Sequence, residues 1–133
     1  MCARKYHHIG IPTTEPKEDE TYVEEWKVSL TPYDKSEFHV QWCRYHPGCI
    51  LPELVQKEPH VAFIVDDMEK ELKGKKIIYG PFTPAAGWRV VFIDECGAPV
   101  ELIETKLTEN EIRSMEKKAF EGKGYAQEIQ QEE

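Results

Sequence analysis

The sequence has no long apolar run. No uninterrupted apolar segment in its 133 residues approaches the roughly 20 residues that a helix needs to cross a bilayer. The first six residues, MCARKY, lead directly into a predicted strand and lack the apolar stretch of a secretory signal. We therefore expect a cytoplasmic protein that neither enters nor crosses a membrane.

Cysteine is scarce, and its spacing does not fit a zinc finger. The four cysteines are Cys2, Cys43, Cys49 and Cys96, and no two of them form a C-x-x-C pair. Because disulfides are rare in the cytoplasm, we interpret all four as reduced thiols. Cys96 lies in a predicted turn with no base beside it in the sequence, which argues against a nucleophilic role.

Positive charge is also in short supply. The chain carries 17 Lys and Arg against 25 Asp and Glu, a net charge of −8. This balance argues against nucleic acids and anionic membranes as partners. Because 40% of the residues are hydrophobic and 32% are charged, the composition is that of an ordinary globular domain. The partner we expect is a small molecule.

What the sequence does contain is a compact unit between Pro59 and Glu104. The unit is predicted to begin with a strand at 60–65, followed by a helix that Asp66 and Glu69 cap and that ends at Gly74. A short extended piece at 75–79 comes next, with breakers at 80–81 and 84–87. Strands at 88–94 and 99–104 then form a hairpin that turns at Gly97.

Strand parity places two polar side chains of this unit on one face. Alternate residues of a strand point to opposite sides, so His60 and Ala62 share a face while Phe63 and Val65 face the helix. Glu101 lies among apolar neighbours on the last strand. Burying an unpaired carboxylate costs several kcal/mol, roughly, so a cation beside Glu101 is expected.

The first half of the chain is predicted to be a shorter version of the second. Its first predicted strand covers 5–12, with His8 and Gly10 on one face and His7 on the other. A loop at 13–20 stands where the second half has a helix. Strands follow at 21–30 and at 38–45, the latter carrying Gln41, and a linker covers 46–58. His39 shares the parity of Gln41 and is a spare ligand candidate, although a surface position is the simpler interpretation.

The C-terminal segment is predicted to be helical. Thr108 and Glu111 form a capping box, and an apolar stripe follows at Ile112, Met115, Ala119 and Phe120. We expect a helix from about 109 to 120 that packs on the body, where it could cover Ile9 and Ile11, or on a partner chain. The last residues, 121–133, are expected to fray.

Both halves open with a His-bearing strand and end with a strand that carries a polar side chain among apolar ones, which indicates an internal repeat. On the segments HHIGIP, HVAFIVDD and GWRVVFIDECGAPVELIE, residues 5–105 resemble the vicinal-oxygen-chelate superfamily, which includes glyoxalases, bleomycin-resistance proteins and ring-cleaving dioxygenases.

The resemblance implies an α+β fold in which paired βαβββ modules form a curved mixed sheet around a cup. Module one would span about 5–57, with its helix missing, and module two would span about 59–105. Both modules lie in one domain at 1–107, and the C-terminal helix and tail follow at 108–133. A divalent metal would be held by His8, Gln41, His60 and Glu101. Gln41 stands where the family more often has Glu.

These ligand types suit Zn, Ni, Fe, Co or Mn. The resemblance implies that such a metal binds adjacent oxygens of a substrate as a Lewis acid, with Glu101 as an additional proton acceptor. Arg44, Arg89 and Trp88 are substrate-binding candidates. Solvated ion pairs for the arginines and a core position for the tryptophan are the competing interpretations.

Three functions follow from the resemblance. The first is a glyoxalase-like lyase or isomerase that acts on a small oxygenated metabolite. The second is a metal-free protein that binds a small molecule or drug, as bleomycin-resistance proteins do. The glutamine at 41 and the shortened first module favour this second function, whereas the two histidines with Glu101 favour the first. A ring-cleaving dioxygenase ranks third. The two modules could pair within one chain or exchange across a dimer. We expect a homodimer, because the exposed sheet edges of the cup favour pairing.

Overall fold

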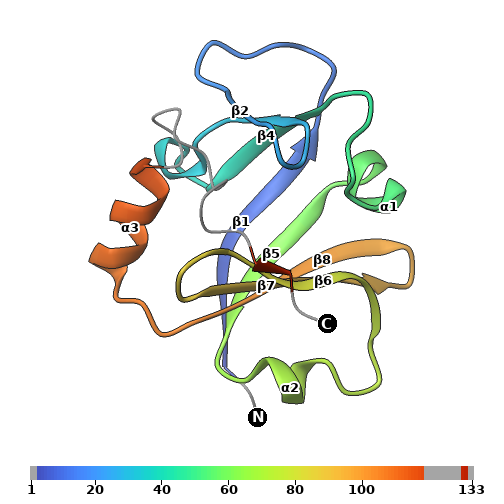
Figure 1. Cartoon of the computed structure of the whole chain (residues 1–133), viewed down its shortest axis with the longest axis vertical. Helices are drawn as coiled ribbons and strands as arrows, with labels where there is room; N and C mark the ends of the chain where they lie inside the picture. Colours follow the sequence, from blue (N-terminus) through green and yellow to red (C-terminus); the bar gives the residue numbers. More distant parts are fainter. Residues whose placement is uncertain (1–2, 119–129, 132–133) are drawn as a thin grey trace.

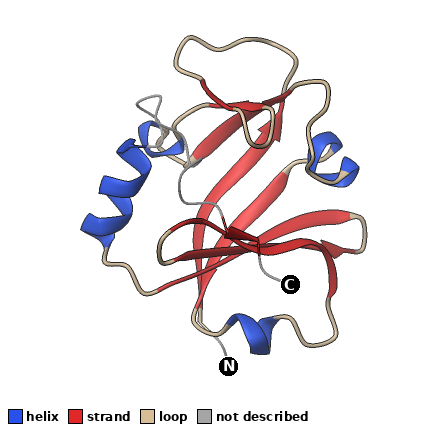
Figure 2. Ribbon diagram, viewed as in Figure 1, coloured by secondary structure: helices blue, strands red, loops and turns tan. Residues whose placement is uncertain are grey.

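The computed structural model describes residues 3–118 and 130–131. Within this part of the chain, a single curved mixed sheet holds most of the residues in regular secondary structure, and a few short helices lie around it (Figures 1 and 2). The sheet order is β2-β3-β4-β1-β5-β8-β7-β6-β9. The predicted α+β class and the curved cup are confirmed.

The strands are β1 (Arg4–Pro12), β2 (Thr21–Val23), β3 (Val28–Leu30), β4 (Val40–Tyr45), β5 (His60–Val65), β6 (Lys76–Ala85), β7 (Trp88–Glu95), β8 (Ala98–Thr105) and β9 (Gln130–Gln131). The helices are α1 (Glu53–Lys57), α2 (Met68–Glu71) and α3 (Glu109–Lys118), together with the 3₁₀ turn η1 (Tyr33–Lys35).

The two halves of the chain meet at the centre of the sheet. β1 pairs in parallel with β4, β5 pairs in parallel with β8, and the two pairs join through the antiparallel β1–β5 contact. Each half therefore contributes its first and last strands to the middle of the sheet. The cup forms within one chain, which the sequence had left open.

The two faces of the sheet pack differently. On the convex face, α2 covers an apolar cluster over β5, β7 and β8, as the parity of β5 predicts. The cluster consists of Val65, Met68, Val91, Ile93 and Leu102. Asp67, rather than Asp66, caps α2 by accepting a hydrogen bond from the backbone N–H of Lys70. The opposite, concave face carries a larger cluster that includes Val55, Trp88 and Phe92.

Two predicted strands differ from those observed. Residues 21–30 form a β2–β3 hairpin, because residues 24–27 turn and Lys27 adopts a left-handed φ of 52°. The predicted breaker at 80–81 does not end β6, which continues through three register shifts against β7. β6 ends at Ala85, within the predicted breaker at 84–87. The bulges absorb the glycine and prolines. The loop at 13–20 is free of helix, as expected.

α3 packs on the concave side of the sheet. Thr108 and Glu111 form the predicted capping box, in which each accepts a backbone hydrogen bond from the other. Ile112 and Met115 pack against the concave cluster, which does not include Ile9 or Ile11, so the expectation that α3 covers these two isoleucines is wrong. The predicted stripe residues 119 and 120 lie outside the described residues.

No helix in the described part of the chain has the length and apolar content needed to span a membrane.

Candidate metal centre

The candidate ligands occupy two adjacent rows across the four central strands. In one row His8 of β1 faces Ala62 of β5, which faces Glu101 of β8. In the next row Gly10 of β1 lies between Gln41 of β4 and His60 of β5. Since the two rows are two residues apart on each strand, all of these side chains point to the concave face.

The two small residues of these rows leave room for the larger ones. A Cβ atom at position 10 would lie 2.2 Å from Cε1 of His60, so the imidazole occupies the space that any larger residue would need. Ala62 is fully buried between His8 and Glu101. Because Gly10 and Ala62 have almost no side chain, the larger polar side chains on either side of them can meet on the concave face.

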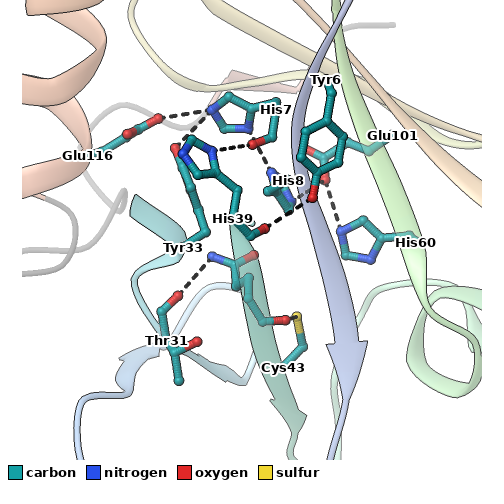
Figure 3. A network of polar contacts seen from close by, with 11 residues as sticks. Tyr6, His7, His8, Thr31, Tyr33, His39, Cys43, His60, Glu101 and Glu116 are labelled. Carbon is teal, nitrogen blue, oxygen red and sulfur yellow. Dashed lines mark hydrogen bonds and ion pairs between the residues drawn. The ribbon is translucent and has the colours of Figure 1, made fainter. Parts of the chain in front are cut away.

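The structure brings His8, His60 and Glu101 into one buried cluster (Figure 3). Oε1 of Glu101 lies 3.2 Å from Nε2 of His60 and 3.5 Å from Nε2 of His8. One ligand atom from each residue falls within 4.8 Å of the others. Their exposed fractions are 4%, 5% and 9%, so water is largely excluded from the cluster.

Protonation in the cluster favours a bound cation. Burial lowers the pKa of His8 to about 4, against the opposing effect of Glu101. Burial alone would raise the pKa of Glu101, but its contacts with His60 and His8 lower it well below the usual range. A neutral imidazole beside an ionised carboxylate is the state that divalent metals require.

The hydrogen bonding also fits a metal. Nε2 of His8 and Nδ1 of His60 are buried and have no hydrogen-bond partner among the described residues. Buried polar atoms are nearly always satisfied, so Nε2 of His8, which faces Glu101 at 3.5 Å, indicates a missing ligand. In His60 the nitrogen beside the carboxylate is Nε2 rather than the unsatisfied Nδ1. Imidazole nitrogen and carboxylate oxygen are the donors that Zn²⁺ and the other first-row divalent ions accept.

Gln41 lies on the wall of the same cavity. Its side chain is buried, and its amide nitrogen donates a hydrogen bond of 3.2 Å to the carbonyl oxygen of Thr31. This bond uses the donor end of the amide and leaves the oxygen as the end that can bind a cation. Cys43, two residues further on, is a poorer ligand because burial raises the pKa of its thiol to about 12.

The cluster opens into a cavity of about 80 Å³. This is small beside the roughly 300–1,000 Å³ of ordinary ligand pockets. Aromatic and aliphatic side chains form most of the wall, among them Trp26, Tyr33, Trp88 and Phe92, and Met115 closes one side from α3. The space is smaller than a drug-sized ligand needs.

Of the three substrate-binding candidates, Trp88 lines this cavity and the two arginines do not. Arg44 forms a bidentate ion pair with Glu20. Arg89 contacts Glu69 at 2.9 Å and Glu104 at 3.7 Å. Both guanidinium groups lie away from the cavity wall, in the ion pairs that were the competing interpretation.

His7 is the site residue that parity misplaced. It was predicted to point away from His8, yet both rings line the cavity, and their Nδ1 atoms are 2.7 Å apart. The cause is a register shift in β1 between Tyr6 and His8, which breaks the strict alternation of the strand. His39 stands just outside β4 at a left-handed φ of 55°, and its Nδ1 lies 2.8 Å from the backbone carbonyl of His7 rather than near Glu101.

Two further polar residues of the cavity were not identified from the sequence. Tyr33 on η1 and Glu116 on α3 are both buried and both contact Nε2 of His7. Glu116 follows Ile112 and Met115 by four residues and one, on the face that packs inward. A charged residue on an apolar helical stripe was the available signal for it.

Comparison with known proteins supports the fold. No family model matches the sequence, and no curated protein does. A hypothetical protein from Bacillus halodurans shares the fold with a TM-score of 0.54 at 18% identity, over 80% of this chain and 97% of that one. Methylmalonyl-CoA epimerase from Mycobacterium tuberculosis gives a TM-score of 0.50 at 16% identity, over 77% of this chain and 89% of that one. At such identities the likeness establishes a shared fold.

Proposed function

We propose that this chain is a member of the vicinal-oxygen-chelate superfamily and a metal-dependent isomerase or lyase that acts on a small oxygenated metabolite. The observation that carries the proposal is the convergence of His8, His60 and Glu101 in one buried cluster, in which Nε2 of His8 faces the carboxylate without a hydrogen-bond partner. The likeness to an epimerase adds a precedent for isomerase chemistry on this fold.

Each side chain has a distinct part in this proposal. His8 and His60 would hold a divalent metal through imidazole nitrogen, Glu101 through carboxylate oxygen, and Gln41 through its amide oxygen. The metal, Zn, Ni, Co, Mn or Fe, supplies a Lewis acid that polarises substrate oxygens. Trp88 and the surrounding aromatic wall exclude water, which strengthens electrostatic interactions inside the cavity.

Glu101 is also our candidate for the proton acceptor. Its contacts with two imidazoles hold the pKa of the carboxyl low, so it stays ionised at neutral pH. A general base needs a free lone pair and a position within hydrogen-bond reach of the substrate proton. A carboxylate has lone pairs on both oxygens, and so one oxygen can serve the metal while the other accepts a proton.

One alternative receives support from the ligand set. Two histidines and one carboxylate with open positions are also the ligands of non-haem Fe(II) oxygenases, so an iron-dependent dioxygenase is our second candidate. Oxygen consumption distinguishes the two, because an isomerase or lyase consumes none and remains active with Zn²⁺ or Co²⁺. A metal-free drug-binding protein receives less support, since the cavity of about 80 Å³ is smaller than drug-sized ligands need.

Metal content tests the proposal directly. We expect protein purified without added metal, or reloaded after chelator treatment, to hold about one divalent ion per chain by elemental analysis. The variant His60→Ala should lose it. His39→Ala is the matched control, since His39 is a nearby histidine whose Nδ1 lies 2.8 Å from a backbone carbonyl rather than in the cluster with Glu101. Full metal occupancy in His60→Ala, or none in the reloaded wild type, contradicts the proposal.

We also propose that two chains form a homodimer. Tyr6 and Phe38 are large exposed side chains, and the Tyr6 hydroxyl donates a hydrogen bond to the backbone carbonyl of Phe38, so the two lie close together. Mass measurement in solution tests this, and a monomer across the micromolar range contradicts it.

A further inference from the structure

A second polar cluster lies directly beside the candidate metal ligands. His7 contacts His8 through Nδ1 at 2.7 Å, and its Nε2 lies 3.1 Å from Oε1 of Glu116 and 3.0 Å from the hydroxyl of Tyr33. His7, Tyr33 and Glu116 are all buried (Figure 3). A continuous chain of contacts therefore runs from α3 through β1 to the metal cluster.

The position of His8 determines which of its nitrogens can bind a metal. Nε2 faces Glu101 and has no hydrogen-bond partner, whereas Nδ1 is engaged with His7. A neutral imidazole carries one proton, and a metal-binding nitrogen must offer a lone pair. Binding through Nε2 therefore requires the proton of His8 to be on Nδ1.

That proton fixes the state of His7 as well. If Nδ1–H of His8 donates to Nδ1 of His7, then His7 must carry its own proton on Nε2. Nε2–H then donates to the carboxylate of Glu116, and the oxygen of Tyr33 can accept as a second partner. The reverse arrangement would place the lone pair of His7 Nε2 against a carboxylate, which can accept but not donate.

We propose that Glu116 and His7 are positioning residues that hold His8 in the tautomer able to bind the metal, so that α3 controls the affinity of the site. This inference rests on the proposed metal-dependent function. Groups that support a metal-binding histidine are known to orient the ring, fix its tautomer and raise its basicity. Here the support comes from a helix outside the paired strands that carry the ligands.

The first experiment measures Zn²⁺ dissociation constants with a competing chelator. Glu116→Gln keeps the shape of the side chain, but its amide can donate to His7 and so permits the reverse arrangement. We expect Glu116→Gln to bind Zn²⁺ about 10- to 100-fold more weakly than the wild type. Glu109→Gln makes the same change on the same helix at an exposed ion pair with Lys5, and its affinity should match the wild type.

A second variant separates the relay from simple docking of α3. Ile112→Ala removes apolar packing between α3 and the concave cluster but leaves the contact of Glu116 with His7. We expect it to lower the melting temperature while it changes Zn²⁺ affinity by less than about threefold, since the supporting contact is retained. If Ile112→Ala weakens Zn²⁺ binding as much as Glu116→Gln does, the relay is wrong.

The tautomers give a readout that a structural role would not change. Long-range ¹⁵N–¹H spectra of the Zn²⁺-loaded wild type should show His8 protonated on Nδ1 and His7 on Nε2. A wild type that binds Zn²⁺, with His60→Ala defective but Glu116→Gln unaffected, overturns the relay and leaves the proposed function standing. A wild type that binds no divalent metal overturns both.

Discussion

Gly10 and Ala62 are the residues that let the candidate ligands converge. Each lies between two larger polar side chains in a row across the sheet. The imidazole of His60 fills the space beside Gly10, and Ala62 is fully buried between His8 and Glu101. Facing pairs of strands are about 5 Å apart, so side chains two strands apart can meet only across a residue that hardly projects.

Replacing Gly10 with alanine should displace His60. The new Cβ would lie 2.2 Å from Cε1 of the imidazole, which must leave its present position beside Glu101. We expect Zn²⁺ binding to weaken by about 10- to 100-fold, as when a ligand loses its support, and the free energy of unfolding to fall by about 1–3 kcal/mol through overpacking. Chelator competition and urea unfolding measure the two effects.

Gly97→Ala serves as the control for Gly10→Ala. Gly97 has a positive φ of 95° in the β7–β8 turn and open space around its Cα. Alanine there should cost about 1 kcal/mol in strain without changing Zn²⁺ affinity. Equal affinities for Gly10→Ala and the wild type would show that His60 is not a ligand in the observed position.

The stability of the metal-free protein should depend on pH through His8. Its pKa falls from 6.5 to about 4 on folding, so between these values the unfolded chain binds a proton that the folded chain does not. Stability therefore falls as the pH drops through this window, by about 3 kcal/mol in total. Glu101, with its lowered pKa, adds a loss in the same direction at pH values below its ordinary 4.5.

Urea unfolding at several pH values, with the metal removed, measures this dependence. His8→Gln removes the titrating imidazole and should flatten the curve between pH 6.5 and pH 4. His46→Gln is the comparison, because His46 pairs with Ser29 at the far end of β3 and β4. A wild type whose stability is constant across the window would contradict the burial-driven shift of His8.

At the residue scale, strand parity placed His60 and Glu101 on one face of the second half, and the family resemblance added His8 to them. The register of β1, β5 and β8 puts these three side chains on the same face of the sheet. Parity failed for His7, since a bulge in β1 depends on how β5 pairs with it, and one strand's sequence does not contain that information.

Among the elements, α3 follows the second half of the chain and lines the cavity that the two halves form together. Its N-terminus is fixed by the reciprocal bonds of Thr108 and Glu111, and its inner face carries Ile112, Met115 and Glu116. Helices of this length are marginal on their own in water. The stability of this helix therefore depends both on the cap and on the apolar contacts.

Removing the cap should loosen α3 without disturbing the sheet. Thr108→Ala eliminates the hydroxyl that accepts from the backbone N–H of Glu111, at a cost of about 1 kcal/mol. We expect faster amide hydrogen exchange in 109–118 and unchanged exchange in β8. Thr108→Ser keeps the hydroxyl and should behave as the wild type. Unchanged exchange in α3 of Thr108→Ala would mean that packing alone holds this helix.

At the element scale, strong local signals predicted α3, β5, β7 and β8 well. The hairpin at 21–30 and the long strand β6 were not predicted, for a common reason. In both segments tertiary pairing decides the outcome: β3 is held by β4, and β6 by β7 across three register shifts. From sequence alone, Gly80 and Pro81 therefore predict a break in the strand, although bulges accommodate them within the sheet.

For the whole molecule, the candidate centre connects the two halves of the chain. His8 and Gln41 come from the first half, and His60 and Glu101 come from the second. The only direct strand pairing between the halves within residues 3–118 is that of β1 with β5. A metal bound by all four side chains would cross-link both halves, so binding and folding should be coupled.

This coupling predicts that Zn²⁺ stabilises the protein. At a free concentration 100 times the dissociation constant, binding to the folded state alone adds about 2.7 kcal/mol, which raises the melting temperature by roughly 10 °C for a chain of this size. Calorimetry with Zn²⁺ or Co²⁺ should show the rise. Mg²⁺, which prefers all-oxygen ligands, should have little effect, and so should Zn²⁺ on Glu101→Ala. A similar rise in Glu101→Ala would place the stabilising ion elsewhere on the acidic surface, because a surface site does not need the one carboxylate that faces both imidazoles.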